Sequence, residues 1–311
     1  NDKIRFHMLI AFSLILLLLS VFLGSPVVAL GLGISLSIIF NVHQNFYTKK
    51  IGTRLLQTGI ILMGLSINFV DALTVTKIYL PAISIFVLLV FILGLIIGKI
   101  IGIDKRFSLL IAAGTAICGG TAMAAITPII KAKPEDLAAG ISIIFILNAF
   151  GIIFFPMIGQ ALNLSELQFG AWVATAIHDT SAVIGASLNY GPYSVETAAT
   201  LKLTRTLWLI PLMIMLAFGM KSEEKKIQFP VFVIFFIIAI ILGSFIDLPF
   251  SSMEIKQLSQ VFLLLGLFSI GSQISRDTLK NFTTDRLIFA TSLWLLVIPI
   301  SYFLVNVIKW E

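Results

Sequence analysis

Long apolar runs constrain the fold of this chain more than any motif does. A helix needs about 20 residues, at 1.5 Å per residue, to cross the roughly 30 Å of hydrocarbon in a bilayer. Eleven runs that approach or reach this length follow one another along the 311 residues: 7–23, 27–41, 54–73, 79–99, 107–129, 137–159, 170–188, 196–219, 229–247, 257–275 and 287–308. The sequence therefore predicts an all-α polytopic membrane protein with about 11 transmembrane helices.

Composition excludes an ordinary soluble enzyme. Hydrophobic residues make up 59% of the chain and charged residues 12%, whereas soluble proteins carry about 45–50% and about 25%. The first run follows Lys3 and Arg5, as in a signal peptide, but it has no small-x-small cleavage site, so we expect it to stay as the first span. One cysteine and three widely separated histidines give no metal motif, and no nucleophile–base set is present. We therefore expect no enzymatic activity, no metal and no cofactor.

Basic residues predict the orientation of the chain in the membrane. With the N-terminus in the cytoplasm, 14 of the 21 Lys and Arg residues face the cytoplasm: Lys3, Arg5, Lys49, Lys50, Arg54, Lys99, Lys105, Arg106, Lys221, Lys225, Lys226, Arg276, Lys280 and Arg286. Five face outside: Lys77, Lys131, Lys133, Lys256 and Lys309. This positive-inside bias indicates a multi-pass membrane protein with its N-terminus in the cytoplasm and its C-terminus outside. The net charge of +6 therefore reflects topology and does not indicate nucleic-acid binding.

An internal repeat relates the two halves of the chain. Pro81 and Gly94 in the fourth run recur as Pro230 and Gly243 in the ninth, and neighbouring matches keep nearly the same offset of about 150 residues. A repeat of five spans must enter the membrane with opposite polarity, as in secondary transporters. We therefore predict three parts: an extra N-terminal helix (1–26), a first five-helix repeat (27–160) and a second, inverted repeat (170–308).

A second register competes with this one. At an offset of 60, Thr115-Ala116-Ile117 matches Thr175-Ala176-Ile177. This register relates spans of the same orientation, and its matches involve mostly small residues. We therefore prefer the longer register.

Small and polar residues indicate breaks in two repeat-related runs. The fifth run contains Cys118, Gly119, Gly120 and Thr121, and its mate in the tenth contains Ser269, Gly271 and Ser272. A helix opened in mid-membrane exposes backbone N–H groups at a half-helix N-terminus, where an anion binds well. We expect these broken helices to cross near the midplane and to form the substrate site. The alternative is that their glycines only permit close helix packing.

The seventh and eighth runs carry ionisable and hydroxyl side chains: His178, Asp179, Thr180, Ser181, Lys202 and Arg205. Each ionisable group at the centre of a span costs at least about 2.5–3.5 kcal/mol, so we expect it to face a partner or a water-filled path. Asp179 is predicted to pair with Lys202 or Arg205, although both cations have the alternative of snorkelling to the interface. His178 either couples transport to protons or only hydrogen-bonds. Asn148 is explained by a helix–helix hydrogen bond.

Three blocks of residues together resemble a known family. They are Cys118-Gly119-Gly120-Thr121-Ala122 with Pro128-Ile129-Ile130-Lys131-Ala132, then His178-Asp179-Thr180-Ser181-Ala182-Val183, then Lys202-Leu203-Thr204-Arg205. In order and spacing these blocks resemble the YeiH-type sulfate exporter family of bacterial membrane proteins over nearly the full chain. The resemblance implies a secondary active transporter of the bacterial cytoplasmic (inner) membrane that exports sulfate, sulfite or a related sulfur-containing anion.

Two functional hypotheses follow from the residues and the resemblance. In the first, an anion binds at the half-helix ends and alternating access moves it, with a proton or sodium as a candidate coupling ion. In the second, the protein is a cation/proton antiporter in which Asp179 is the ion-binding carboxylate. Two basic residues against one acid within the spans favour the anion. The lipid bilayer is the other expected partner, and a homodimer is left open.

Overall fold

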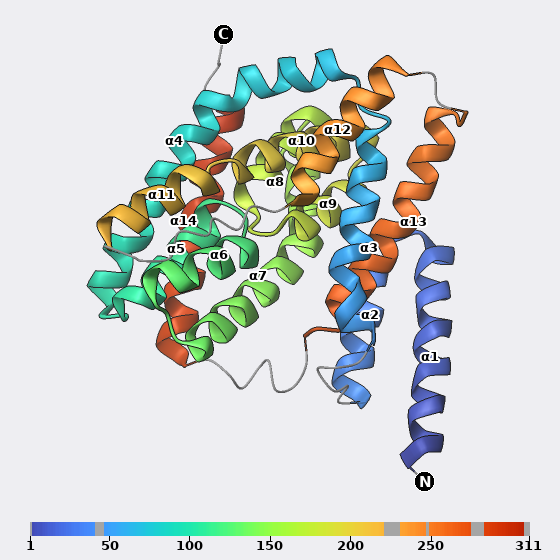
Figure 1. Ribbon diagram of the computed structural model, residues 1–311, viewed down its shortest axis with the longest axis horizontal. Coiled ribbons are helices and arrows are strands. Elements are labelled where there is room, and N and C mark those ends of the chain that lie inside the picture. Colours follow the sequence, from blue (N-terminus) through green and yellow to red (C-terminus); the bar gives the residue numbers. More distant parts are fainter. Residues whose placement is uncertain (1, 41–46, 221–230, 247–248, 275–282, 308–311) are drawn as a thin grey trace. The chain divides into compact units, whose positions relative to one another are not determined.

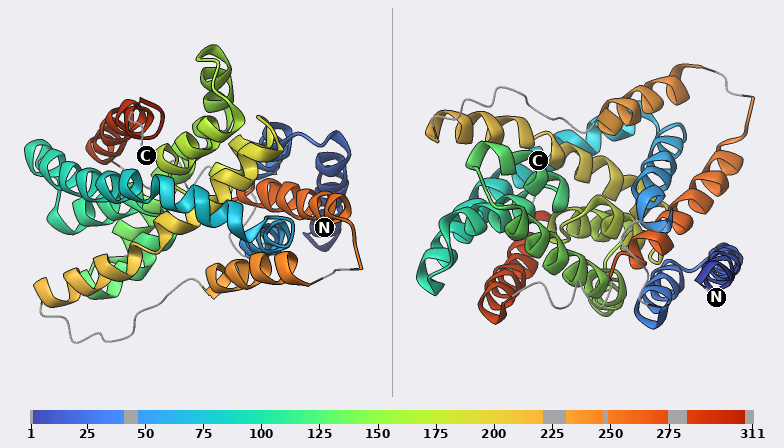
Figure 2. Two further views of the ribbon diagram at one scale, coloured as in Figure 1. Left: turned by 90° about the horizontal axis from the view of Figure 1, so that it is seen from above. Right: turned by 60° about the horizontal axis from the view of Figure 1, so that its bottom comes forward.

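The computed structural model describes residues 2–40, 47–220, 231–246, 249–274 and 283–307, and in these ranges every regular element is a helix (Figure 1, Figure 2). Several residues named above lie outside the described ranges: Lys221, Lys225, Lys226, Pro230, Arg276, Lys280 and Lys309. The chain divides into two compact units. Unit 1 comprises Asn1–Asn68 and Phe235–Lys280, and unit 2 comprises Phe69–Ile234 and Asn281–Glu311.

Helices occupy the positions of all eleven apolar runs. Those before the first predicted break are α1 (Asp2–Leu23), α2 (Pro26–Phe40), α3 (Tyr47–Gly64) and α4 (Phe69–Ile101). The central helices are α5 (Lys105–Ala116), α6 (Gly120–Ile130), α7 (Pro134–Ala161), α8 (Glu166–Ala176), α9 (Thr180–Leu188), α10 (Pro192–Thr206) and α11 (Leu209–Gly219). The last are α12 (Val231–Phe245), α13 (Ser252–Gly271) and α14 (Thr284–Tyr302), which a short π-helix (Phe303–Val307) follows.

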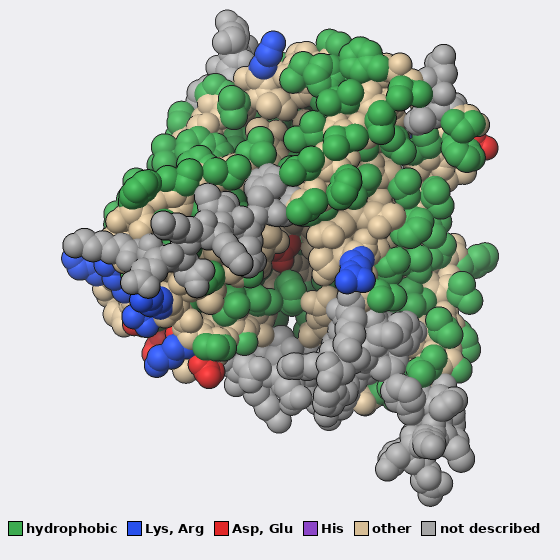
Figure 3. All heavy atoms as spheres, viewed as in Figure 1, with side chains coloured by type: hydrophobic (Ala, Val, Ile, Leu, Met, Phe, Trp, Pro, Cys, Tyr) green, Lys and Arg blue, Asp and Glu red, His purple; other side chains and the backbone are tan. Residues whose placement is uncertain are grey.

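Five helical stretches in the described ranges are long and apolar enough to cross a membrane. They are α4 (Phe69–Ile101), α7 (Pro134–Ala161), α10 and α11 taken together (Pro192–Gly219), α13 (Ser252–Gly271), and α14 with most of the π-helix (Thr284–Asn306). Shorter apolar helices are Leu9–Leu23, Pro26–Phe40, Gly120–Ile130 and Val231–Phe245. Many large hydrophobic side chains are exposed, and they are spread widely over the face drawn in Figure 3. Such a surface fits lipid rather than water, which agrees with a multi-pass membrane protein.

In unit 1, α13 packs closely against α2 and α3. A Cβ atom added to Gly33 would collide with the carbonyl of Phe268, and one added to Gly271 would collide with the carbonyl of Leu30. Helix α13 is continuous from Ser252 to Gly271. The predicted break in the tenth run is therefore wrong over this range, because its glycines let helices approach closely instead of opening one.

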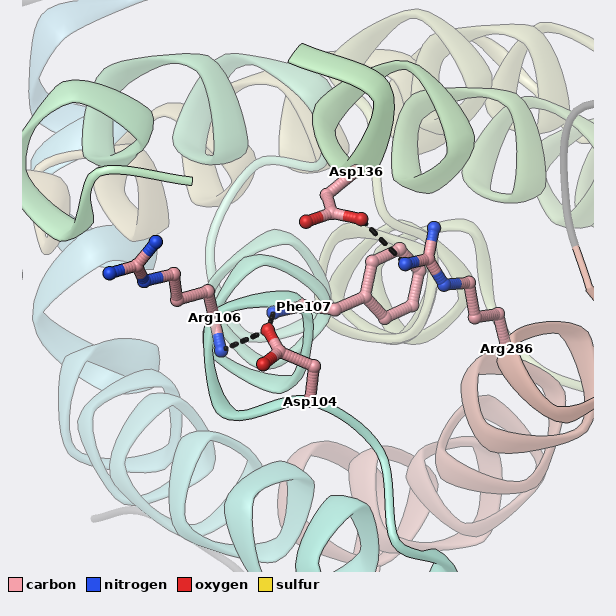
Figure 4. Close-up of polar contacts among 5 residues, drawn as sticks. All are labelled: Asp104, Arg106, Phe107, Asp136 and Arg286. Atoms are coloured by element: carbon pink, nitrogen blue, oxygen red, sulfur yellow. Dashed lines mark hydrogen bonds and ion pairs between the residues drawn. The ribbon is translucent and has the colours of Figure 1, made fainter. Parts of the chain in front are cut away.

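In unit 2, α5 and α6 form a hairpin, here called hairpin 1. Figure 4 shows its base: Arg286 of α14 pairs with Asp136 at the start of α7 at 2.5 Å, and its guanidinium lies 4.3 Å from the ring centre of Phe107 at the start of α5. Farther along, a Cβ on Gly114 of α5 would lie 3.1 Å from Met123 of α6. Helix α6 thus folds back along α5, and α7 begins where α5 began.

Helices α8 and α9 form a second hairpin, hairpin 2. The hydroxyl of Tyr190, just after α9, donates to the carbonyl of Leu164, just before α8, at 2.6 Å. The same tyrosine ring stacks on Phe169 of α8 with 3.8 Å between centres. At the start of α8, Glu166 accepts the backbone N–H of Tyr193 in α10 at 2.7 Å. Hairpin 2 therefore also ends beside its own beginning.

The long helix α7 connects the two hairpins and sets their directions. It starts at the base of hairpin 1 and ends at the base of hairpin 2, where a Cβ on Gly159 would touch both Phe169 and Tyr190. The hairpins therefore enter unit 2 from opposite ends. Each half-helix of 9 to 12 residues spans at most about 18 Å. The fifth and seventh runs therefore each turn back halfway instead of forming one continuous helix, and the count of eleven crossings is not confirmed.

The shorter repeat register has a structural counterpart. Helices α5 and α8 stop at Ala116 and Ala176, and α6 and α9 start at Gly120 and Thr180, so both breaks recur at an offset of 60. The following helices, α7 and α10, both begin with proline. Because the hairpins enter from opposite ends, this repeat is inverted rather than of one orientation. The five-plus-five repeat stays a prediction.

Candidate functional site

The tips of the two hairpins meet beside the middle of α7. Asp179, in the turn of hairpin 2, accepts the backbone N–H of Gly120 in hairpin 1 at 3.0 Å. Its other oxygen accepts from the side-chain amide of Asn148 in α7 at 2.7 Å. Gly119 precedes α6 with φ of 60°, and a Cβ there would collide with the Asp179 carboxylate. Glycine is thus required both for the left-handed turn and for the close approach.

Arg205 of α10 binds the other ends of the half-helices. Its guanidinium donates to five backbone carbonyls: Ala116 at 2.7 Å, Ala174 at 2.9 Å, Thr175 at 2.8 Å, Ile177 at 3.2 Å and Thr115. These are carbonyls that the C-terminal turns of α5 and α8 leave without helical partners. The group is fully buried and lies 4.8 Å from the ring centre of Phe86 in α4. The snorkelling alternative is therefore wrong for Arg205.

Lys202, one turn earlier on α10, is also fully buried, so it does not snorkel either. Its ammonium donates to the carbonyl of Ile177 at 2.8 Å. His178 is buried beside it in the hairpin 2 turn, with its ring centre 5.9 Å from that of Trp294 in α14. Neither ring nitrogen of His178 has a hydrogen-bond partner within the described ranges.

The predicted ion pair between Asp179 and a cation is not formed. Among the described residues, Asp179 makes no contact within salt-bridge distance of Lys202 or Arg205. Each charge faces helix ends of opposite sign instead. The carboxylate lies at the N-terminal ends of α6 and α9, and the guanidinium lies at the C-terminal ends of α5 and α8. The dipoles of these half-helices stabilise the buried charges, whereas the sequence predicted that side chains of opposite charge would do so.

The structure gathers ten of the predicted site residues at the hairpin tips: Cys118, Gly119, Gly120, Thr121, His178, Asp179, Thr180, Ser181, Lys202 and Arg205. Cys118 is buried, whereas Thr121 is exposed and Thr180 and Ser181 are partly exposed. Although Asp179 is the N-cap residue of α9, its side chain does not cap that helix. The first turn of α9 therefore lacks a side-chain cap.

The other three predicted residues belong to unit 1. The hydroxyl of Ser269 donates to the carbonyl of Leu265 at 2.8 Å, and that of Ser272 donates to the carbonyl of Ser269 at 2.6 Å. Gly271 lies against α2, as described above. These contacts serve the packing of α13, and a role for these residues in substrate binding stays a prediction.

Sequence reasoning missed that the middles of three long helices, α4, α7 and α14, and the last turn of α10 surround the tips. Besides Asn148 and Arg205, these positions include Phe86 of α4 and Trp294 of α14, whose indole N–H donates to the carbonyl of Ala176 at 3.0 Å. The hydrogen bond expected for Asn148 is confirmed, and its partner is Asp179. In the sequence, a polar or aromatic residue at the centre of a long apolar run would have indicated such a position.

Comparison with known proteins places the chain in a family. The model of the family described as "Conserved hypothetical protein 698" matches residues 6–290. A UPF0324 membrane protein of Bacteroides thetaiotaomicron is 38% identical over 276 residues, covering 88% of this chain and 84% of the relative. A UPF0324 membrane protein of Vibrio parahaemolyticus is 38% identical over 295 residues, covering 93% of this chain and 95% of the relative. One of Vibrio vulnificus is 40% identical over 306 residues, covering 94% of this chain and 96% of the relative. No solved structure matches. These relatives carry no sulfate-exporter name, and the chain belongs to the UPF0324 family of membrane proteins.

Proposed function

We propose that the protein is a secondary transporter that moves a small anion, such as sulfate, sulfite or a related sulfur-containing anion, across the bacterial cytoplasmic membrane. The observation that carries the proposal is the meeting of two opposed hairpins around buried charges in unit 2. Interrupted backbone at membrane depth is tolerated only where protein buries it or where it lines a path. In secondary transporters such interrupted helices from inverted repeats form the substrate site near the midplane.

The charges at the tips favour an anion over a cation. Lys202 and Arg205 supply two positive charges against the single negative charge of Asp179, and all three are at least nine-tenths buried. The first turns of α6 and α9 add the hydroxyls of Thr121, Thr180 and Ser181. The backbone N–H groups of an uncapped first turn attract anions through the helix dipole.

The hairpins also sharpen the proposed orientation. If α5 starts in the cytoplasm, the return of α6 brings Lys131 and Lys133 to the cytoplasmic side as well. The split of basic residues then changes from 14 and 5 to 16 and 3, since the segment 162–191 carries no Lys or Arg. This stronger positive-inside bias supports a cytoplasmic N-terminus and nine crossings with two re-entrant hairpins.

The cation/proton antiporter is the rival because Asp179 is a buried carboxylate at the tips. Its hydrogen bonds argue for a structural role. Both of its oxygens already accept a hydrogen bond, one from Gly120 and one from Asn148. A carboxylate held in this way stabilises the ends of two half-helices and leaves less capacity for a transported cation.

Flux measurements on purified protein in liposomes test the proposal. We expect uptake of labelled sulfate, sulfite or methanesulfonate above that of protein-free vesicles, and no sodium uptake. Anion flux should persist in Asp179→Asn and disappear in Arg205→Ala, while the exposed-site control Arg106→Ala keeps wild-type flux. Sodium flux that Asp179→Asn abolishes would transfer the assignment to the cation antiporter.

A further inference from the structure

Lys202 carries the one buried charge at the tips that helix ends and side chains leave uncompensated. A helix terminus acts as about half an elementary charge, positive at the N-terminus and negative at the C-terminus. Arg205 donates to carbonyls at the C-terminal ends of both α5 and α8, and Asp179 accepts the first N–H of α6 and the side-chain amide of Asn148. Each of these two charges is therefore held by a helix end and by further hydrogen bonds. One positive charge, that of Lys202, remains.

The surroundings of Lys202 do not remove this excess. The side chain is fully buried, and its hydrogen bond goes to the carbonyl of Ile177, which Arg205 also uses. An ammonium has three N–H donors, so this one bond uses a third of them. Asp179 is held by Gly120 and Asn148 rather than by Lys202.

The other charged or titratable groups that act on Lys202 are few. They are Cys118 in the turn of hairpin 1, His178 and Asp179 in the turn of hairpin 2, and Arg205 on its own helix. Helix α4, which also packs against α10, contributes none from the part of the chain that the structure describes. An isolated ammonium in a dry interior is unstable, and a buried lysine responds by losing its proton or by gaining an anion.

Resting on the proposed function, we infer that Lys202 couples the anion to a proton, so that one singly charged anion and one proton cross together without net charge. In the empty transporter the nitrogen of Lys202 is a neutral amine. On the loading side its lone pair takes a proton from water, an N–H bond forms, and the ammonium binds the anion. On the other side the anion leaves, the N–H bond breaks, and the proton returns to water.

The test uses purified full-length protein in liposomes that contain a fluorescent pH indicator and a potassium gradient with valinomycin to set the membrane potential. Methanesulfonate is the probe because it stays singly charged at all working pH values, and sulfate is the doubly charged comparison. We expect inward methanesulfonate to acidify the lumen by one proton per anion, at a rate that the membrane potential does not change.

Two variants separate coupling from binding. Lys202→Arg keeps a positive charge that does not give up its proton, so methanesulfonate uptake should continue without acidification and should become sensitive to membrane potential. Lys202→Gln should lose acidification altogether. The control Lys105→Gln, which changes an exposed lysine at the base of hairpin 1, should behave as wild type.

Each other outcome overturns a defined part of the argument. Methanesulfonate uptake by wild type without acidification, or acidification that survives in Lys202→Arg, overturns the coupling role of Lys202. Uptake of sulfate but not methanesulfonate overturns the single-charge assignment and leaves the proposed function standing. No flux of either anion above protein-free vesicles overturns the proposed function and the inference with it.

Discussion

Replacing Arg205 tests whether one guanidinium holds both hairpin tips together. Its hydrogen bonds reach the end of α5 through Ala116 and the end of α8 through Ala174. Three carbonyls share one nitrogen that has two hydrogens, so the five hydrogen bonds use at most four N–H groups. At the lower value of about 1.5 kcal/mol for a charge-assisted bond, the four contribute about 6 kcal/mol.

We therefore expect Arg205→Met to lower the free energy of unfolding by about 6 kcal/mol, a large share of the roughly 5–15 kcal/mol that stabilises a typical protein. Arg205→Lys keeps the charge, but one ammonium cannot reach the carbonyls at both helix ends. It should lose about half of the bonds and about 3 kcal/mol.

Denaturant titration in mixed micelles measures both changes. Tryptophan fluorescence is a suitable signal because Trp172 and Trp294 are buried in hairpin 2 and α14 beside the site. Arg106→Met is the matched control, since this arginine is exposed at the start of α5 and its change should stay within about 0.5 kcal/mol. A loss below about 1 kcal/mol for Arg205→Met would show that the helix ends do not depend on this side chain, and would refute the reasoning.

Three further outcomes are expected. In a Cys118→Ala background, a cysteine at Lys133 should react only from the cytoplasm and one at Asn163 only from outside; labelling of Lys133→Cys from outside would contradict the re-entrant hairpin. Gly119→Ala should reduce anion flux at least about tenfold, because its left-handed φ adds about 1–2 kcal/mol of strain and its Cβ meets Asp179. Gly31→Ala, which adds a Cβ in open space, should transport as wild type, and equal flux in both variants would remove the close-approach argument. Asp179→Asn should keep measurable anion flux, and its loss would favour the cation antiporter.

Hydropathy predicted where the helices lie but not which of them cross. A re-entrant hairpin of two short half-helices has nearly the same apolar length as one span, so the run 107–129 has the composition of a crossing helix. The sequence feature that indicates the hairpin is the distribution of basic residues between the two sides of the membrane. Lys131 and Lys133 were two of the five basic residues assigned to the outside, and in the proposed orientation the fold-back of α6 places both on the cytoplasmic side. Loop charge therefore held information that hydropathy did not.

The sequence identified the charged residues of the site but assigned them the wrong partners. Burial of Asp179, Lys202 and Arg205 followed from their position within apolar runs, and an ion pair was the simplest way to satisfy them. The partners are backbone groups of broken helices, and these exist only after both hairpins have folded and met. The offset of 60 was the available evidence for a second break. Two helices that both crossed the membrane at that spacing would have the same orientation, so the offset did not by itself indicate an inverted repeat.

The same contacts bear on how access would alternate in the proposed transporter. Arg205 joins the C-terminal ends of both hairpins, and Asp179 joins hairpin 2 to the first residue of α6. Opening one tip alone would break about half of the Arg205 bonds, which contribute about 3 kcal/mol, together with the hydrogen bond from Gly120 to Asp179. Movement of the two tips together with α10, which carries Arg205, breaks none of the Arg205 bonds. Within unit 2 the hairpins and α10 therefore form a single moving part, so alternating access in the proposed transporter should displace both tips and Lys202 together.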